Sequence, residues 1–131
     1  MGTTLSYAEV DQKSRQFAAY LRNNLNLQVG DRVAIMLPNI LQYSIGLFGI
    51  LRAGLVVVNA NPLYTPRELN HQLTDSGAQV LLVLENFAHV VEKSLAGTEV
   101  NQVITTGVGD LLAFPKSAIV NGVLKLSLIH I

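Results

Sequence analysis

The chain has 131 residues, a length that fits a single domain or part of one. Only 14% of the residues are charged and half are hydrophobic, whereas soluble proteins average about 25% charged residues, so we expect further chain to bury some apolar surface. Nine basic and nine acidic residues give a formal net charge of zero, which excludes the basic footprint of a nucleic-acid-binding protein and a polybasic membrane anchor.

A helix is predicted near the amino end of the chain. Ser6 can cap it, and Glu9, three residues later, completes a capping box. Leu5 and Val10 are spaced as a hydrophobic staple across this cap. The helix should end near Asn23–Asn24, and its apolar face is formed by Val10, Phe17, Leu21 and Leu25.

A strand, a helix and a second strand are predicted next. After a turn at Gly30–Asp31, residues 33–37 (VAIML) are continuously apolar, as expected of a strand covered on both faces. Asn39 can cap a helix that runs to about residue 53, and Gly54 suits the left-handed position that closes it. Residues 55–58 (LVVV) predict another buried strand, and together these elements form a βαβ unit, which should be parallel and right-handed.

The same region contains the most membrane-like stretch of the sequence, residues 40–58. A spanning helix needs about 20 nearly uninterrupted apolar residues. This stretch contains Gln42, Arg52 and three glycines. It is therefore interpreted as a buried helix followed by a buried strand.

The second half of the chain continues the alternation of helices and strands. Thr65 as cap, Pro66 at the first helical position and Glu68 form a second capping box, with Tyr64 and Leu69 as its staple. This helix should stop near Ser76–Gly77. Strands at 80–84 and 100–105, a short helix at 87–95 and a further helix at 118–125 complete the prediction. The pattern indicates an α/β fold with a parallel sheet.

Known catalytic and nucleotide-binding motifs are largely missing from the sequence. Residues 107–112 (GVGDLL) begin like a dinucleotide fingerprint, but Leu112 occupies the third glycine position, so a simple glycine turn is favoured. The chain has no Gly-x-x-x-x-Gly-Lys-Ser/Thr loop and no Gly-x-Ser-x-Gly elbow. No catalytic residue is predicted.

A metal site is not predicted either. The absence of cysteine excludes disulfides and thiolate ligands, and a reducing compartment is allowed. His71, His89 and His130 have no partner at metal-ligand spacing. Asp75, four residues after His71, is expected to form a surface hydrogen bond or a weak ion pair with it.

Polar residues at strand ends are the remaining candidates for a binding site, since ligands of parallel sheets usually lie beyond the carboxyl ends of the strands. Asn39 is interpreted first as a helix cap. Asn59, Asn61 and Tyr64 follow the second strand, and two interpretations stay open for them. The favoured one is a turn stiffened by Pro62, and the other is the wall of a substrate or cofactor entrance.

Four segments carry a family resemblance: GDRVAIMLPN at 30–39, LFGILRAG at 47–54, NPLYTPREL at 61–69 and DSGA at 75–78. With ILQY and NFAH, they make residues 5–125 closely resemble the N-terminal region of bacterial long-chain fatty-acid–CoA ligases. These enzymes belong to the AMP-forming, adenylate-forming superfamily. The resemblance implies parallel-sheet βαβ layers that are part of the large N-terminal domain, with residues 1–125 a fragment of that AMP-binding (adenylation) domain.

The resemblance also implies a reaction in two steps. The fatty-acid carboxylate attacks the α-phosphate of ATP, which gives acyl-adenylate and pyrophosphate, and the thiol of CoA then displaces AMP. ATP, CoA and Mg²⁺ would serve the full-length enzyme, whose phosphate loop and catalytic lysine are expected beyond the matched region. No catalytic residue is therefore carried over. Asn61 and Tyr64 are the candidate cofactor-binding residues, on a loop facing the approach of CoA.

Several expectations follow for the chain as a whole. Residues 126–131 are expected to be a non-native or truncated tail, and the fragment alone is expected to be inactive because its partner is the remainder of the same chain. A cytoplasmic location is implied, with peripheral association with the inner membrane as an option. Two alternatives remain open: another acyl- or aryl-CoA ligase of the superfamily, or a stand-alone α/β binding module.

Overall fold

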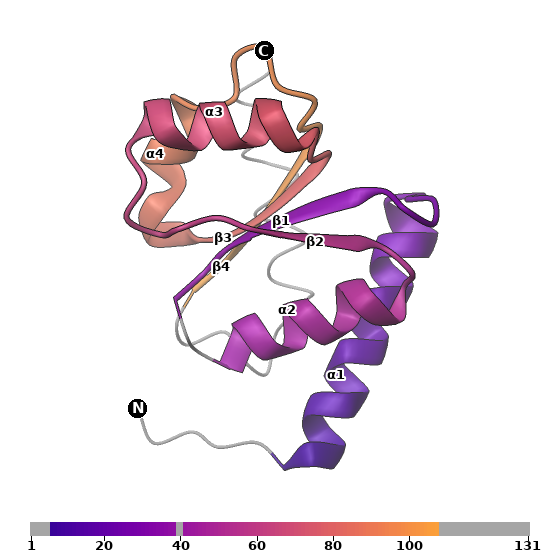
Figure 1. The fold of residues 1–131 in the computed structure, drawn as a ribbon. Coiled ribbons are helices and arrows are strands. Elements are labelled where there is room, and N and C mark those ends of the chain that lie inside the picture. Colours follow the sequence, from indigo (N-terminus) through magenta and orange to yellow (C-terminus); the bar gives the residue numbers. More distant parts are fainter. Residues whose placement is uncertain (1–5, 39–40, 108–131) are drawn as a thin grey trace.

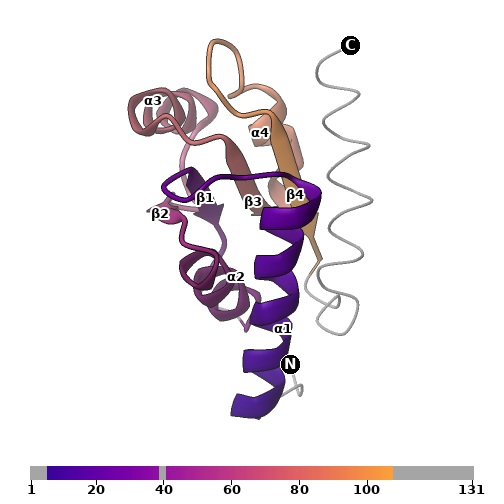
Figure 2. The ribbon, with the colours of Figure 1, turned by 90° about the vertical axis from the view of Figure 1, so that its right-hand side faces the viewer.

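The computed structural model describes residues 6–38 and 41–107. In this part of the chain, four strands form one parallel sheet in the order β2-β1-β3-β4. Helices lie on both sides of the sheet, with α1 and α2 on one side and α3 and α4 on the other (Figures 1 and 2). The strands are β1 (Arg32–Met36), β2 (Val56–Asn59), β3 (Val80–Leu84) and β4 (Gln102–Thr106).

The helices follow the predicted order with small shifts at their ends. The helix predicted at 87–95 is divided into a 3₁₀ turn and a short α-helix, and the strand predicted at 100–105 begins two residues later than predicted. The helical elements are α1 (Tyr7–Ala19) with a π-helical extension (Tyr20–Asn24), α2 (Leu41–Arg52), α3 (Pro66–Ser76), a 3₁₀ turn (Glu85–Phe87) and α4 (Ala88–Glu92).

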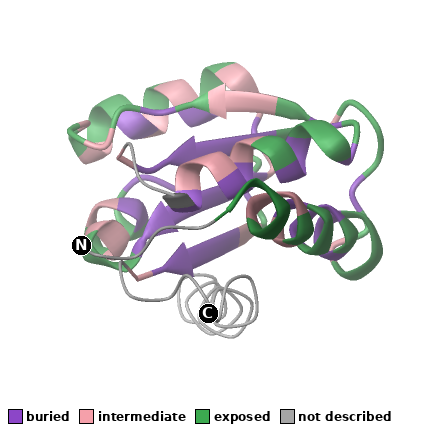
Figure 3. Ribbon diagram, turned by 90° about the horizontal axis from the view of Figure 1, so that it is seen from below, coloured by how far each residue is buried: buried purple, intermediate pink, exposed green. Residues whose placement is uncertain are grey.

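The two central strands divide the core into two clusters. Alternate residues of a strand point to opposite faces, so Val33 and Ile35 pack under α1 and α2, whereas Ala34 and Met36 pack under α3 and α4. Every residue of β3 is buried. The prediction of strands covered on both faces is therefore confirmed for β1 and β3 (Figure 3).

The prediction of a second buried strand at 55–58 is wrong in part. Leu55 is buried, but β2 begins at Val56, whose exposed fraction is 44%, and none of the four residues of β2 is fully buried. The physical reason is its position, because among the described strands β2 pairs with β1 alone and has fewer neighbours than the central strands β1 and β3. A run of valines does not distinguish an edge strand from a central one.

Apolar exposure does not come from an uncovered face of the sheet. Helices cover both faces of the central strands β1 and β3, so neither of these strands has an uncovered apolar face. The exposed apolar side chains lie instead on helix surfaces, on loops and on the edge strand, namely Tyr7, Val29, Phe48, Leu51, Val56 and Leu63. Single exposed apolar residues of this kind are normal on a protein surface.

The predicted capping boxes of α1 and α3 and the left-handed conformation of Gly54 are confirmed. Both capping boxes form, at Ser6 with Glu9 and at Thr65 with Glu68. Gly54 and Gly77 have φ angles of 78° and 68°, the left-handed conformation that glycine adopts without strain. The predictions for Leu5, Asn39, residues 108–112 and 118–125, His130 and residues 126–131 lie outside the described residues.

Helix α2 packs unusually close to its neighbours through two glycines. A Cβ atom at Gly49 would lie 2.7 Å from Cδ2 of Phe17 and 3.1 Å from the backbone oxygen of Ser14. A Cβ at Gly46 would lie 2.6 Å from Cδ2 of Leu82 on β3. The absence of side chains at these two positions therefore lets α2 contact both α1 and the sheet.

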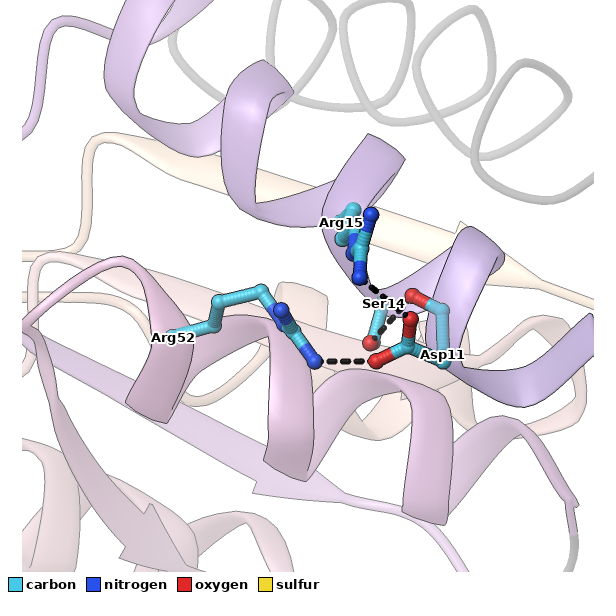
Figure 4. A network of polar contacts seen from close by, with 4 residues as sticks. All are labelled: Asp11, Ser14, Arg15 and Arg52. Carbon is cyan, nitrogen blue, oxygen red and sulfur yellow. Dashed lines mark hydrogen bonds and ion pairs between the residues drawn. The ribbon is translucent and has the colours of Figure 1, made fainter. Parts of the chain in front are cut away.

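Polar contacts secure the same helix pair at its edge. The Asp11 carboxylate on α1 pairs with Arg15, 2.9 Å away, and with Arg52 on α2, while the Ser14 hydroxyl donates to the backbone oxygen of Asp11 at 2.8 Å (Figure 4). Arg22 donates to the carbonyl of Ala53 at 2.9 Å, just beyond the last residue of α2. Exposed ion pairs contribute only about 0–1 kcal/mol each, so apolar packing dominates this interface.

Substituting Gly49 should show how much the fold depends on this close approach. Gly49→Ala should lower the free energy of unfolding by about 1–3 kcal/mol through overpacking, although alanine favours an exposed helix by about 1 kcal/mol. Gly46→Ala should destabilise less, since the obstructing atom is the tip of a flexible side chain. Chemical unfolding of the 131-residue chain measures the loss of unfolding free energy in each variant. Equal losses in the two variants would contradict an obstructing role of the Ser14 backbone oxygen.

The capping box of α1 should make that helix sensitive to acid. The backbone N–H of Ser6 donates to the Glu9 carboxylate at 3.0 Å, and this hydrogen bond, with the neighbouring Ser6 side chain, lowers the pKa of Glu9 below the ordinary range. The folded pKa is depressed, so this stabilisation is present above the ordinary glutamate range and is lost as pH falls through the folded pKa. An NMR titration should give a low midpoint for Glu9, and Glu9→Gln should remove this component of the acid sensitivity of α1.

Candidate functional site at the end of strand β2

The candidate residues lie where strand β2 ends and helix α3 begins. All four strands are parallel, so their carboxyl ends meet at one edge of the sheet. Asn59 ends β2 and Thr65 caps α3, which leaves a loop of residues 60–64 between them. We call residues 60–64 the β2–α3 loop. It contains both residues that the sequence selected, Asn61 and Tyr64.

Hydrogen bonds within the β2–α3 loop hold it in a tight turn. The side-chain oxygen of Asn61 accepts from the backbone N–H of Leu63 at 2.9 Å, and its carbonyl accepts from the N–H of Tyr64 at 3.0 Å. This is the asparagine turn that the favoured interpretation of the sequence predicts. Asn61 therefore has a structural role whether or not it binds a ligand.

Tyr64 connects the loop to the core and to an open groove. It is half-buried and packs against the cluster under α3, in which Leu69 is fully buried, as the predicted staple requires. Tyr64 also lines a groove of about 480 Å³ along α3. The other residues of this groove are Arg67, Glu68, His71, Gln72 and Asp75.

The groove combines an aromatic ring with groups of both charge signs. Arg67 offers a guanidinium and His71 an imidazole, whereas Glu68 and Asp75 offer carboxylates. The Glu68 carboxylate is already engaged by the Thr65 N–H at 2.9 Å. Such a lining can bind and orient a polar ligand, but its arrangement contains no nucleophile activated by a neighbouring base.

Leu63 is a feature of the loop that sequence reasoning missed. Its exposed fraction is 85%, although it lies between the turn at Asn61 and the half-buried Tyr64. The periodicity of helices and strands gives no signal inside a five-residue loop. Leu63 therefore adds an exposed apolar side chain to the loop.

Long-range hydrogen bonds at the carboxyl ends of the strands were also missed. The Tyr43 hydroxyl on α2 donates to the side-chain oxygen of Asn59 at 2.7 Å, and the Gln72 amide on α3 donates to the Asn59 carbonyl at 2.7 Å. Gln42, which is almost fully buried, donates to the carbonyl of Gly107 at 2.9 Å, just past β4. Partners 13 to 65 residues apart leave no local pattern in a sequence.

The histidines show no binding arrangement in the described part of the chain. His71 and Asp75 line the same groove, but the expected hydrogen bond or ion pair between them is not found among residues 6–38 and 41–107. Over these same ranges, no group of three or more histidine or acidic side chains could hold a metal ion. The groups with displaced pKa values are Glu9 and Tyr20, whose hydroxyl pKa is raised by burial. Neither belongs to the candidate site.

The described segments contain no helix that is both long enough and apolar enough to span a membrane. This finding covers α2, the helix within the most hydrophobic stretch of the sequence, which has 12 residues. Helix α2 is instead packed between α1 and the sheet. The predicted helix and the strand after it are therefore confirmed, but the helix is only partly buried, since Phe48 and Leu51 are about half exposed, and the strand is not buried.

The match to a protein-family model decides the relationship of the chain. The model of the AMP-binding enzymes matches residues 1–126. The chain belongs to the AMP-binding enzyme family. The structure confirms the predicted fold class, an α/β arrangement with a parallel sheet.

Individual relatives agree with the family match. Over 125 residues, the chain is 55% identical to the long-chain-fatty-acid–CoA ligase of Yersinia pestis and 57% identical to that of Haemophilus influenzae. Each match covers 95% of this chain and 22% of the relative. The chain thus spans about a fifth of the length of these relatives.

Solved structures of ligases share the fold. The crystal structure of a long-chain-fatty-acid–CoA ligase from Archaeoglobus fulgidus superposes with a TM-score of 0.78 at 23% sequence identity. The superposition covers 90% of this chain and 24% of the other. At this identity, the match shows a shared α/β fold only.

Proposed function

We propose that this chain is the N-terminal part of a long-chain fatty-acid–CoA ligase, which converts a fatty acid and ATP to acyl-adenylate and then transfers the acyl group to CoA. The observation that carries the proposal is the 55–57% identity, over 95% of the chain, to proteins named for this activity. On this proposal, residues 1–125 are part of the N-terminal AMP-binding domain. The enzyme is cytoplasmic, and peripheral contact with the inner membrane is an option.

The chemistry of the first step is assigned to residues outside this chain. Adenylation requires groups that stabilise charge on the phosphates, such as a positioned lysine or Mg²⁺. Among the described residues, no acidic or histidine cluster suits a metal, and we assign neither Mg²⁺ nor the phosphates of ATP to residues of this chain. The isolated chain is therefore proposed to be inactive.

The β2–α3 loop is proposed to contact CoA during the second step. Asn61 holds the turn, and Tyr64 presents its ring on the groove that also contains Arg67 and His71. An aromatic face can stack on a base, and cationic groups can pair with phosphate. These residues would bind and orient the nucleotide end of CoA, with no part in bond breaking.

A hybrid ligase provides the direct test of the proposed activity. The 125 aligned residues should replace their counterparts in the Yersinia pestis ligase, and the remainder of that enzyme should supply the chemistry. We expect palmitate-dependent exchange of pyrophosphate into ATP and palmitoyl-CoA formation, with little activity on benzoate. The 131-residue chain alone should show neither reaction. A hybrid that folds but activates benzoate in preference to palmitate would contradict the long-chain assignment.

Substituting Tyr64 in the same hybrid separates CoA binding from adenylation. Loss of a stacked base costs about 1–3 kcal/mol, so Tyr64→Ala should raise the KM for CoA about tenfold. Tyr64→Phe keeps the ring and should remain within about twofold of the parent hybrid, as expected when one exposed hydroxyl contributes little. Steady-state kinetics measure KM, and pyrophosphate exchange should be unchanged. Equal loss in both half-reactions would show that Tyr64 acts only through packing.

A further inference from the structure

We propose that Asn59 is a positioning residue that fixes the β2–α3 loop for its ligand, through hydrogen bonds from both helical layers. The inference rests on the proposed role of this loop in the CoA step. Asn59 itself does not contact the ligand in this proposal. It determines where the loop begins, and thereby where Tyr64 presents its ring.

Three hydrogen bonds converge on the beginning of the loop. The Tyr43 hydroxyl, from the layer of α1 and α2, donates to the side-chain oxygen of Asn59 at 2.7 Å. The Gln72 amide, from the layer of α3 and α4, donates to the Asn59 carbonyl at 2.7 Å. The backbone N–H of Ala60 donates to the carbonyl of Ile35 on β1 at 2.9 Å. Both helical layers and the neighbouring strand thus secure the same point.

The edge position of β2 explains why such anchoring is needed. Strand β2 has four residues and pairs with β1 on one side only among the described strands. Short, exposed edge strands open more easily than central ones. Hydrogen bonds from Tyr43 and Gln72 instead join the end of this edge strand to the two helical layers.

The orientation of the Gln72 side chain secures the loop at a cost in folding stability. Its amide nitrogen bonds to Asn59, while its side-chain oxygen is buried and has no hydrogen-bond partner in the described structure. A buried polar atom without a partner is destabilising by about 1–3 kcal/mol. Replacing Gln72 with an apolar residue of similar shape removes this unfavourable atom together with the bond to Asn59. Overall stability should then change little while the loop is released.

The other end of the loop is independently fixed. The capping box joins Thr65 and Glu68, and the Asn61 turn braces the residues between. With both ends held, the five loop residues have little freedom, so the ligand does not have to order them on binding. Releasing the Asn59 end should weaken ligand binding without affecting steps that do not use the loop.

The kinetic experiment uses the hybrid ligase with Tyr43→Phe, Gln72→Met and, as a matched control, Tyr20→Phe. Tyr20 belongs to the same core cluster that Tyr43 packs against, and the control also removes one tyrosine hydroxyl. Loss of one hydrogen bond corresponds to about 0.5–1.5 kcal/mol, so Tyr43→Phe and Gln72→Met should each raise the KM for CoA about twofold to tenfold. Palmitate-dependent pyrophosphate exchange should be unchanged in both, and Tyr20→Phe should alter neither quantity.

Amide hydrogen exchange of the 131-residue chain gives a second readout that needs no activity. Tyr43→Phe and Gln72→Met should accelerate exchange at Ala60 and Leu63, while exchange in β3 stays unchanged. Unchanged loop exchange, an unchanged KM for CoA or parallel loss of both half-reactions would overturn the positioning role. An inactive parent hybrid with faster loop exchange in the two variants would instead support the anchoring and contradict the proposed function.

Discussion

The close packing of helix α2 is the constraint on which the rest of the structure depends. Gly46 lets α2 approach Leu82 of β3, and Gly49 lets it approach Phe17 of α1. Helix α2 is also the connection between β1 and β2, so its depth determines how the chain returns to pair in the register that sets Ile35 beside Asn59. A wider gap would lose the dispersion contacts of the core under α1 and α2 and displace the edge strand.

This constraint extends to the candidate site because α2 supplies one of its anchors. Tyr43, in the first half of α2, reaches Asn59 only if the helix lies against the sheet. Helix α3 supplies the opposing anchor through Gln72. Each bond contributes only about 1 kcal/mol, yet the core that places their donors is far stronger. The position of the β2–α3 loop is therefore set by packing and then refined by hydrogen bonds.

Local chemistry explains which parts of this arrangement the sequence could predict. The capping boxes at Ser6 and Thr65 and the left-handed glycines depend on neighbouring residues, and all of them form as expected. The edge position of β2 depends instead on strand order, which hydrophobic periodicity does not encode. The anchors of Asn59 join residues 13 and 16 positions away on other elements. Their polar atoms meet only after the two helical layers have packed on the sheet.

The structure also divides the family signature NPLYTPREL by physical role. Asn61 makes the turn, and Thr65 and Glu68 cap α3, so these residue types are accounted for by the backbone that they stabilise. Local structure does not require an exposed leucine at position 63, nor does the staple require that Tyr64 also line a groove. A motif can thus identify a family chiefly through residues that build a loop. Neither the exposure of Leu63 nor the place of Tyr64 in the groove is required by the loop backbone. These two side chains of the loop are therefore the ones most available to a ligand.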